Sequence, residues 1–301
     1  MLLRTLWMRT IVEQLFANNA FLLKSLDWNE YVQSGLKTVV IPQAGTPADF
    51  EVNRSVFPAT ITARQDGDIQ FDMNDYTVNP RLVKNIEQKQ LSYDKMASEV
   101  RLMLGNVKQG VALDVLYSWR PELAGQIIET TGATKATTLV GSTGNRKAIC
   151  YADVVAGATL LDNQDVDGEG RQMLLPANLY NQLMLDPDVK QNFNTKLADL
   201  STGVLGHLCG FEIMKRSSVL KISDSGVTRT RTAATAAADS QSCLFWHPDW
   251  VGRSVGNEDV IMDAAPRAEY YGRIMSAQLQ AGGSKVSATG VGVGAIRPAN
   301  V

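Results

Sequence analysis

Histidine and cysteine are scarce in this chain of 301 residues, and neither sign of charge dominates. The two histidines, His207 and His247, leave little material for acid–base chemistry. Three cysteines (Cys150, Cys209 and Cys243) cannot all pair within one chain, so no disulfide framework is indicated. The 29 Lys and Arg residues nearly balance the 31 Asp and Glu residues, which argues against a protein that binds nucleic acid through a basic face. The composition predicts a reduced, neutral, soluble chain.

Long hydrophobic runs are also missing, even at the apolar N-terminus. Charged residues and asparagines interrupt residues 1–26 every few positions, so no run of about 18 apolar residues could span a bilayer, and the zones of a signal peptide are absent. Apolar residues recur there at helical spacing, among them Trp7 and Phe16. Two interpretations stay open: an amphipathic helix on its own core, or an arm on a neighbouring subunit. For an arm, we expect truncation of residues 1–30 to prevent assembly and leave a folded subunit.

Residues 163–168 have the polar spacing of a calcium loop, with Asn163 at its first position and Gly168 at its sixth. The twelfth position, which needs a bidentate Glu, is Leu174. The sequence therefore favours a polar surface turn over a calcium site.

Glycine-rich segments do not complete a nucleotide-binding motif. No helix with an acidic residue follows Gly290, Gly292 and Gly294, so we expect these glycines in a β segment. The stretch 141–147 lacks the gap and the Lys-Ser/Thr ending of a phosphate loop. We interpret it as a loop before a helix.

Zinc is the remaining metal alternative, because His207, Cys209, Cys243 and His247 are suitable ligand types. In the competing interpretation, the cysteines are small apolar residues buried in the core. No G-x-S-x-G occurs, and no pair of carboxylates is marked by its surroundings. We therefore assign no catalytic residue, no cofactor and no metal, and we expect no enzyme.

An extended segment follows the N-terminal region. Residues 36–41 are a β-rich run, and alternation returns at Ile69, Phe71 and Met73 after a predicted turn at Asp66-Gly67. Two extended stretches around a Pro- and Gly-containing tip predict a long β-hairpin that a partner stabilises. We select Arg54 and Phe57 on this loop, with Trp7 and Phe16 on the arm, as candidate subunit contacts.

Residues 86–119 carry the clearest helical pattern. Apolar residues follow at steps of three and four: Tyr93, Met96, Val100, Met103, Val107, Val111 and Val115. A helix of about 30 residues would be about 45 Å long. Packing must hold it, since Gly105 and Gly110 each cost about 1 kcal/mol relative to Ala.

Shorter elements are expected after residue 121. They comprise a turn-rich stretch at 132–145, a helix from Arg146 to Leu161, a buried strand at 172–175, a short helix that starts near Pro176, and a glycine turn into a strand at 205–220. A surface loop at 225–240 and a strand from 241 follow. The last β runs are expected to split at Gly282-Gly283.

This order of elements resembles the major capsid protein of tailed double-stranded DNA bacteriophages, the Hong Kong 97-type fold. The likeness lies in residues 36–76, 86–119, 158–189 and 200–220, where no single motif is diagnostic but the order is specific. The resemblance implies an α+β fold. Its parts are an N-terminal arm (1–35), an extended β-hairpin loop (36–80), a peripheral domain with a spine helix (81–120 and 250–301) and an axial α/β domain (121–249).

The resemblance implies a structural protein that self-assembles as pentamers and hexamers into an icosahedral head. Double-stranded DNA would be contacted non-specifically, and a portal, a separate scaffolding protein and cement proteins would be partners. The chain would be part of the virion and would assemble in the host cytoplasm, without a membrane. An encapsulin-like nanocompartment shell is the first alternative, and an α/β enzyme with an unrecognised site is the second.

Two departures limit what the resemblance implies. Some relatives link their subunits through a lysine on the extended loop, but no lysine lies between Thr38 and Pro80. We therefore expect a shell held by non-covalent contacts. The sequence also begins almost at the arm, so we expect a separate scaffolding protein or none, unless the chain is a processed form.

Overall fold

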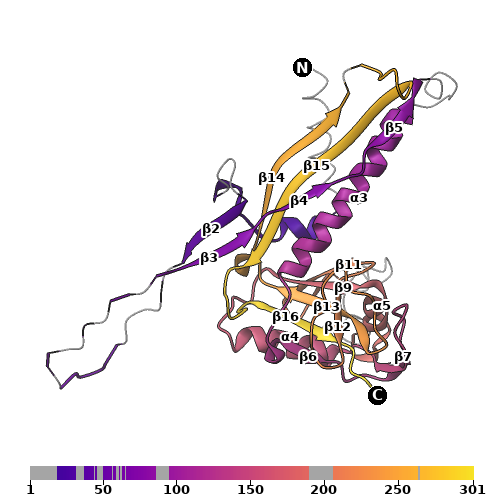
Figure 1. Cartoon of the computed structure of the whole chain (residues 1–301). Helices are drawn as coiled ribbons and strands as arrows, with labels where there is room; N and C mark the ends of the chain where they lie inside the picture. Colours follow the sequence, from indigo (N-terminus) through magenta and orange to yellow (C-terminus); the bar gives the residue numbers. More distant parts are fainter. Residues whose placement is uncertain are drawn as a thin grey trace.

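The structure is a computed structural model that describes residues 19–31, 37–43, 45, 50–55, 57–58, 61, 63–64, 66–85, 95–189, 206–263 and 265–301. These residues form an elongated layer, in which a long helix lies along a five-stranded sheet, and a compact layer built on a seven-stranded sheet (Figure 1). A two-stranded hairpin projects away from both layers (Figure 1).

The elongated sheet is built on two long antiparallel strands, β14 (Val251–Met262) and β15 (Gly272–Lys285). The short strand β1 (Leu26–Asp27) runs parallel to β14, while β4 (Asn74–Thr77) and β5 (Arg81–Lys84) pair with β15. The end of the segment that was expected to form the extended loop therefore belongs to this sheet, because β4 pairs with β15.

Helix α3 (Lys95–Ser118) lies along this sheet and confirms the long helix expected from the periodicity (Figure 1). The described part is 24 residues, about 36 Å at 1.5 Å per residue. Residues 86–94, the expected first turns, lie outside the described residues. Four residues of the apolar series are buried against the chain's own core: Val100, Met103, Val111 and Val115.

Strand β15 continues through Gly282 and Gly283, so the expected split at these glycines is wrong. The glycines serve close packing instead. A Cβ at Gly283 would lie 2.9 Å from the Ser118 Oγ and 3.0 Å from the Val115 Cγ1. The absence of a side chain lets the end of α3 approach the strand.

The compact layer has a sheet in the order β10-β11-β9-β13-β16-β6, with β12 paired to β13. Its strands are β6 (Ile127–Glu129), β9 (Arg171–Pro176), β10 (His207–Leu208), β11 (Phe211–Arg216), β12 (Leu220–Ser223), β13 (Asp239–Trp246) and β16 (Val293–Arg297). Helices α4 (Tyr151–Asp162) and α5 (Ala177–Leu185) and a small hairpin of β7 (Thr134–Ala136) and β8 (Asn145–Lys147) complete the layer.

The central strands of this sheet are buried on both faces. On β9, Met173 and Leu175 join the cluster that contains residues of α4 and α5, whereas Leu174 joins the cluster at the end of α3. Strand β13 alternates in the same way, with Phe245 on one face and Trp246 on the other. Burial on both faces explains why these strands are continuous apolar runs. The predicted buried strand and the short helix after Pro176 are confirmed.

Two local boundaries differ from the sequence prediction. Arg146 lies in β8, and α4 begins only at Tyr151, because the Asp153 carboxylate accepts a 2.9 Å hydrogen bond from the Cys150 N–H and caps the helix there. The expected loop at 225–240 ends early, since Asp239 and Ser240 are buried in β13.

The last strand also differs from expectation. Strand β16 pairs with β13 and β6 in the compact layer, and it does not join β14 and β15 as expected for residues 250–301. Four short 3₁₀ helices occur in the described chain: η1 (Ala20–Leu23), η2 (Asn29–Tyr31), η3 (Ala124–Gln126) and η4 (Pro248–Trp250). Among the described helices, none combines the length and apolarity that a membrane crossing requires.

Candidate assembly surfaces

The projecting hairpin is formed by β2 (Thr38–Gln43) and β3 (Gly67–Asp72). The strands pair antiparallel from Thr38 opposite Asp72 to Gln43 opposite Gly67, which confirms the predicted β-hairpin. Gly67 was expected in a turn, but it is the first residue of β3, because its pairing with Gln43 extends the ladder to that point.

The base of the hairpin is fastened to the elongated layer. Val39 and Met73 are almost fully buried, and the Phe71 ring lies 5.4 Å from the Trp28 ring between centroids. The Gln43 side-chain amide donates to the backbone carbonyl of Val286. These contacts fix the direction in which the hairpin leaves the molecule.

The far end of the hairpin exposes large apolar side chains. Phe50 is 90% exposed, Phe57 76% and Ile61 95%. Arg54 forms an ion pair with Glu51 at 3.1 Å. The structure thus places the candidates Arg54 and Phe57 on one apolar tip, together with Phe50 and Ile61, which the sequence analysis missed. The sequence could have indicated Phe50 and Ile61, because several large apolar residues in a segment with no expected packing partner on its own chain are typical of a contact surface.

The two candidates on the N-terminal arm, Trp7 and Phe16, lie outside the described residues. The segment that follows them is packed into the chain's own core. The Phe21 ring meets the rings of Trp119 and Trp246 edge-on, with centroids 6.3 Å and 6.5 Å away. Part of the region predicted as an arm, residues 20–28, therefore holds the subunit together.

Polar contacts secure the same segment, which we call the clasp (residues 20–29). Arg253 on β14 donates through Nη1 to the Ser25 carbonyl (3.1 Å) and the Ser25 hydroxyl (2.9 Å). Lys24 forms a 2.8 Å ion pair with Glu212 on β11, and this hydrogen bond holds the pKa of Glu212 below its ordinary value. The clasp is therefore bound to a strand of each layer.

The calcium-like turn at 163–168 wraps around an arginine. The buried Arg171 side chain donates to the Asp167 carbonyl (2.7 Å), the Val166 carbonyl (2.6 Å) and the Asp162 carboxylate (2.6 Å). Leu174, at the position where a calcium loop needs Glu, is buried in β9. The guanidinium of Arg171, the first residue of β9, thus uses backbone oxygens of this turn.

The possible zinc ligands serve other purposes. Cys243 is fully buried in β13, and burial raises the pKa of its thiol to about 12. The His247 Nε2 lies 3.0 Å from the Glu169 carbonyl. In the part of the chain that the structure describes, no three His, Cys, Asp or Glu side chains gather as a metal-ligand group.

The glycine-rich segments shape turns and a strand. Gly290 and Gly292 have positive φ angles of 71° and 77° before β16, and Gly294 lies within that strand. Gly141 and Gly144 lie between β7 and β8 with φ angles of 90° and 89°. Of the three glycines that were expected in a β segment, Gly290, Gly292 and Gly294, only Gly294 lies in a strand.

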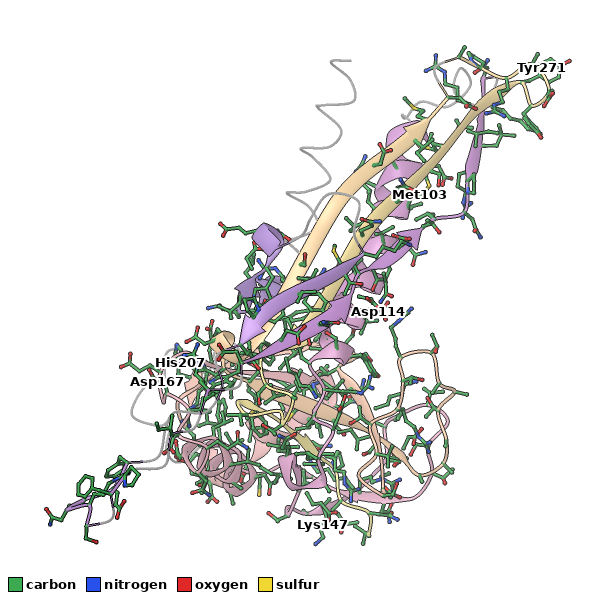
Figure 2. The ribbon with its side chains drawn as sticks, turned by 60° about the vertical axis from the view of Figure 1, so that its left-hand side comes forward. Met103, Asp114, Lys147, Asp167, His207 and Tyr271 are labelled. Carbon is green, nitrogen blue, oxygen red and sulfur yellow. The ribbon has the colours of Figure 1, made fainter. Side chains whose placement is uncertain are left out.

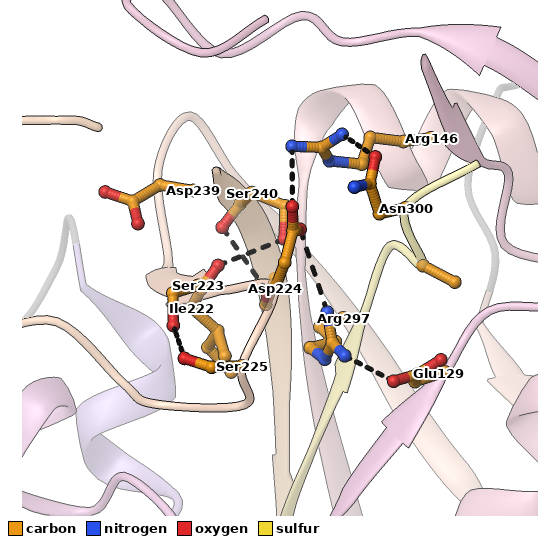
Figure 3. A network of polar contacts seen from close by, with 12 residues as sticks. Glu129, Arg146, Ile222, Ser223, Asp224, Ser225, Asp239, Ser240, Arg297 and Asn300 are labelled. Carbon is orange, nitrogen blue, oxygen red and sulfur yellow. Dashed lines mark hydrogen bonds and ion pairs between the residues drawn. The ribbon is translucent and has the colours of Figure 1, made fainter. Parts of the chain in front are cut away.

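A polar network ties the end of the chain to the compact layer (Figure 3). Asp224 lies 3.5 Å from Arg146 and 3.8 Å from Arg297, and Arg297 also pairs with Glu129. Asn300 accepts a 2.6 Å hydrogen bond from Arg146. Two nearly buried cations thus share one carboxylate, and the second carboxylate, on Glu129, is more than half exposed.

Comparison with known proteins supports one fold. No protein-family model matches the sequence, and no curated protein matches it either. Solved structures do match. The capsid of the cyanophage P-SCSP1u has a TM-score of 0.65 and 15% sequence identity, with 92% of this chain and 87% of that chain covered. The capsid of the cyanophage Pam1 has a TM-score of 0.64 and 8% identity, with 91% of this chain and 88% of that chain covered. The capsid of the Ralstonia phage GP4 has a TM-score of 0.63 and 10% identity, with 92% of this chain and 87% of that chain covered. The chain therefore has the α+β fold of phage capsid proteins, as the resemblance implied.

Proposed function

We propose that this chain is a structural major capsid protein of a tailed double-stranded DNA bacteriophage. Pentamers and hexamers of the chain would form the icosahedral head. The observation that carries the proposal is the agreement of fold with phage capsid structures over 92% of this chain and 87% of the matched chain.

The exposed hairpin tip supports assembly on physical grounds. Phe50, Phe57 and Ile61 expose their side chains to water on a hairpin whose described packing contacts lie at its base. A large apolar group costs about 1.5–3 kcal/mol when it stays exposed instead of buried. A neighbouring copy that covers the tip would recover this free energy at every repeat of the lattice.

The parts of the subunit receive roles in this proposal. The sheet of β14 and β15 with α3 is the peripheral domain and its spine helix, and the seven-stranded layer is the axial domain. The hairpin β2–β3 is the extended loop. Arg54 and Phe57 on the hairpin, and Trp7 and Phe16 on the arm, are the proposed contacts with neighbouring subunits.

Further partners follow from the role of a head protein. A portal, a separate scaffolding protein and cement proteins would bind the lattice, and packaged DNA would be contacted without sequence preference. The chain would assemble in the host cytoplasm and reside in the capsid of the virion. The proposed role requires no catalysis and no cofactor.

Particle assembly tests the proposal directly. The full chain is expressed and purified, and particles are counted and sized by electron microscopy. Closed shells with DNA and a tail in infected cells support the phage role, whereas a small cage filled with protein cargo supports the nanocompartment alternative. A defined monomer or dimer that never assembles, with or without a scaffold, would contradict both.

A pair of variants connects assembly to the hairpin tip. Replacement of Phe57 and Ile61 by Ser is expected to lower shell yield at least tenfold and to leave the thermal unfolding of the subunit unchanged. Val140→Ser is the matched control, because Val140 is 90% exposed on the turn between β7 and β8. Equal shell yields for all three proteins would contradict a role for the tip.

The shell is expected to be held by non-covalent contacts. Lys37, the lysine next to the hairpin, forms an ion pair with Asp75, and its hydrogen bond lowers the pKa of that carboxyl group. Mature particles should run as a single band of about 32.8 kDa in denaturing electrophoresis. A ladder of covalent oligomers would contradict this expectation.

A further inference from the structure

A small cavity beside the β7–β8 hairpin has charged lining residues of one sign only. Lys135, Arg146 and Lys147 line it, and no Asp or Glu does. The cavity has a volume of about 20 Å³, which is room for about one water-sized group. Lys147 lies at the end of the molecule opposite Tyr271, far from the tip of the long sheet (Figure 2).

The strand register brings two of these cations together. In the antiparallel ladder of β7 and β8, Lys135 lies directly opposite Arg146. Side chains directly opposite each other share one face of the ladder, where like charges are destabilising. Lys147, the next residue along β8, belongs to the opposite face of the ladder, but it also lines the cavity. The hairpin therefore concentrates positive charge at the cavity.

The carboxylates of the subunit do not neutralise this charge. Asp224 approaches Arg146 at 3.5 Å, but Arg297 lies 3.8 Å from the same carboxylate (Figure 3). Neither Lys135 nor Lys147 has an ion-pair partner among the described residues. After Asp224 is counted against Arg146, the lining keeps an excess of two positive charges.

Arg146 also has an unused donor. The residue is 5% exposed, and its Nε has no hydrogen-bond partner within the described part of the chain. A buried N–H without an acceptor is destabilising. Thr138 and Gln182 add hydroxyl and amide groups to the lining. The site thus offers charged and neutral donors, and none of its lining residues is an anion.

We propose that this cavity binds a phosphate group, one oxygen of which enters it while the lysines contact the remaining oxygens. A phosphate oxygen matches the small volume, and the negative charge matches the excess of two cations. A free phosphate and a phosphodiester of the packaged DNA share this chemistry. The proposal concerns the subunit itself and holds whether or not the chain forms shells.

Binding is measured on the full-length subunit by isothermal titration calorimetry. The probes are inorganic phosphate and a short oligothymidylate without terminal phosphates, each compared with chloride at equal ionic strength, because salt screens exposed charges. The variant Lys135→Gln with Lys147→Gln is expected to weaken binding at least tenfold. Lys84→Gln is the matched control, since Lys84 is an exposed lysine on β5 of the other sheet.

The two probes separate the two sources of phosphate. Binding of inorganic phosphate alone identifies a site for free phosphate, whereas binding of the oligonucleotide alone identifies a site for the DNA backbone. Either result supports the cavity only if the double variant loses it and the Lys84→Gln control keeps it. Equal affinity of the double variant and the wild-type chain, or no binding beyond that of chloride, would overturn the proposal.

Discussion

The indole Nε1 of Trp246 donates a 2.8 Å hydrogen bond to the backbone carbonyl of Lys24, although 222 residues separate the two. Trp246 is fully buried at the end of β13 in the compact layer. Arg253 on β14 of the elongated layer binds the same short segment through Ser25. The clasp therefore joins both layers within one subunit.

This anchoring predicts different outcomes for two N-terminal truncations. Deletion of residues 1–18 leaves in place every clasp contact with the described residues, so the subunit should fold with an unchanged thermal midpoint. Deletion of residues 1–30 removes Phe21, Leu22 and Trp28, and loss of one large buried side chain costs about 2–5 kcal/mol. Because a domain is stable by only about 5–15 kcal/mol, the longer deletion should abolish cooperative unfolding. Near-UV circular dichroism and thermal melts measure this.

The same pair of truncations separates folding from assembly. The structure revises the expectation that residues 1–30 could be removed without harm to the fold, and the shorter deletion is the proper test of the arm. If Trp7 and Phe16 contact neighbours, the chain without residues 1–18 should be folded and form no closed shells. Normal shell yield from that chain would contradict the arm, and a well-folded chain without residues 1–30 would contradict the clasp.

Local patterns in the sequence predicted the described α-helices and several of the strands. The steps of three and four through Val100, Met103 and Val111 were sufficient for α3, because a helical face depends on near neighbours alone. The hairpin of β2 and β3 was predicted for a similar reason. The pairing of β16 with β13 and the burial of Phe21 depend on contacts across more than 40 residues, which periodicity does not encode.

The candidate assembly residues show the same division. Prolines and glycine marked residues 42–58 as an exposed loop, so Phe57 could be selected, and the same reasoning could have added Ile61. The calcium-like turn failed as a site because its acceptors surround Arg171. A sequence shows the residues of such a turn and does not show that a guanidinium uses their oxygens.

Arg171 should be essential for the stability of the compact layer. Its guanidinium serves the exposed Asp162 carboxylate and carbonyls that include those of Val166 and Asp167, so Arg171→Ala leaves these carbonyls without their donor. We expect a loss of about 3 kcal/mol in the free energy of unfolding, measured by urea titration. Arg171→Lys should recover little of it, because a point charge cannot replace the planar fork.

The control for this prediction is Arg101→Ala on the exposed side of α3. An exposed substitution without a special role changes stability by about 0.5 kcal/mol or less. Similar urea midpoints for Arg171→Ala and Arg101→Ala would show that the turn does not depend on the guanidinium.

The three cysteines should differ in reactivity toward a thiol reagent. Cys150 and Cys209 are partly exposed, whereas Cys243 is fully buried, and burial raises the pKa of its thiol to about 12. Since the thiolate is the reactive form, two thiols should react in the native subunit and the third only after unfolding. Burial also raises the pKa of Cys209, so Cys150 should be the faster of the two. Three fast thiols in the native subunit would contradict the buried placement of Cys243.

Asp239 should make stability depend on acid pH. Burial alone would raise its pKa, but the Ala236 N–H and the Arg229 guanidinium, each donating at 2.8 Å, lower it below the ordinary value of 3.8. A carboxyl group with a lowered folded-state pKa stabilises the fold above its unfolded pKa, and this contribution is lost as the pH falls through the folded value. Asp239→Asn should therefore cost about 2 kcal/mol near neutral pH.

The difference between the wild-type chain and Asp239→Asn should shrink as the pH falls below about 3.8, because the protonated carboxyl group no longer gains from Arg229. Urea unfolding at neutral pH and at successively lower pH values measures this convergence. Asp165→Asn is the control, because Asp165 is exposed on the turn after α4, and this variant should give the wild-type profile throughout. A constant difference at every pH would mean that the Asn variant loses packing and not charge.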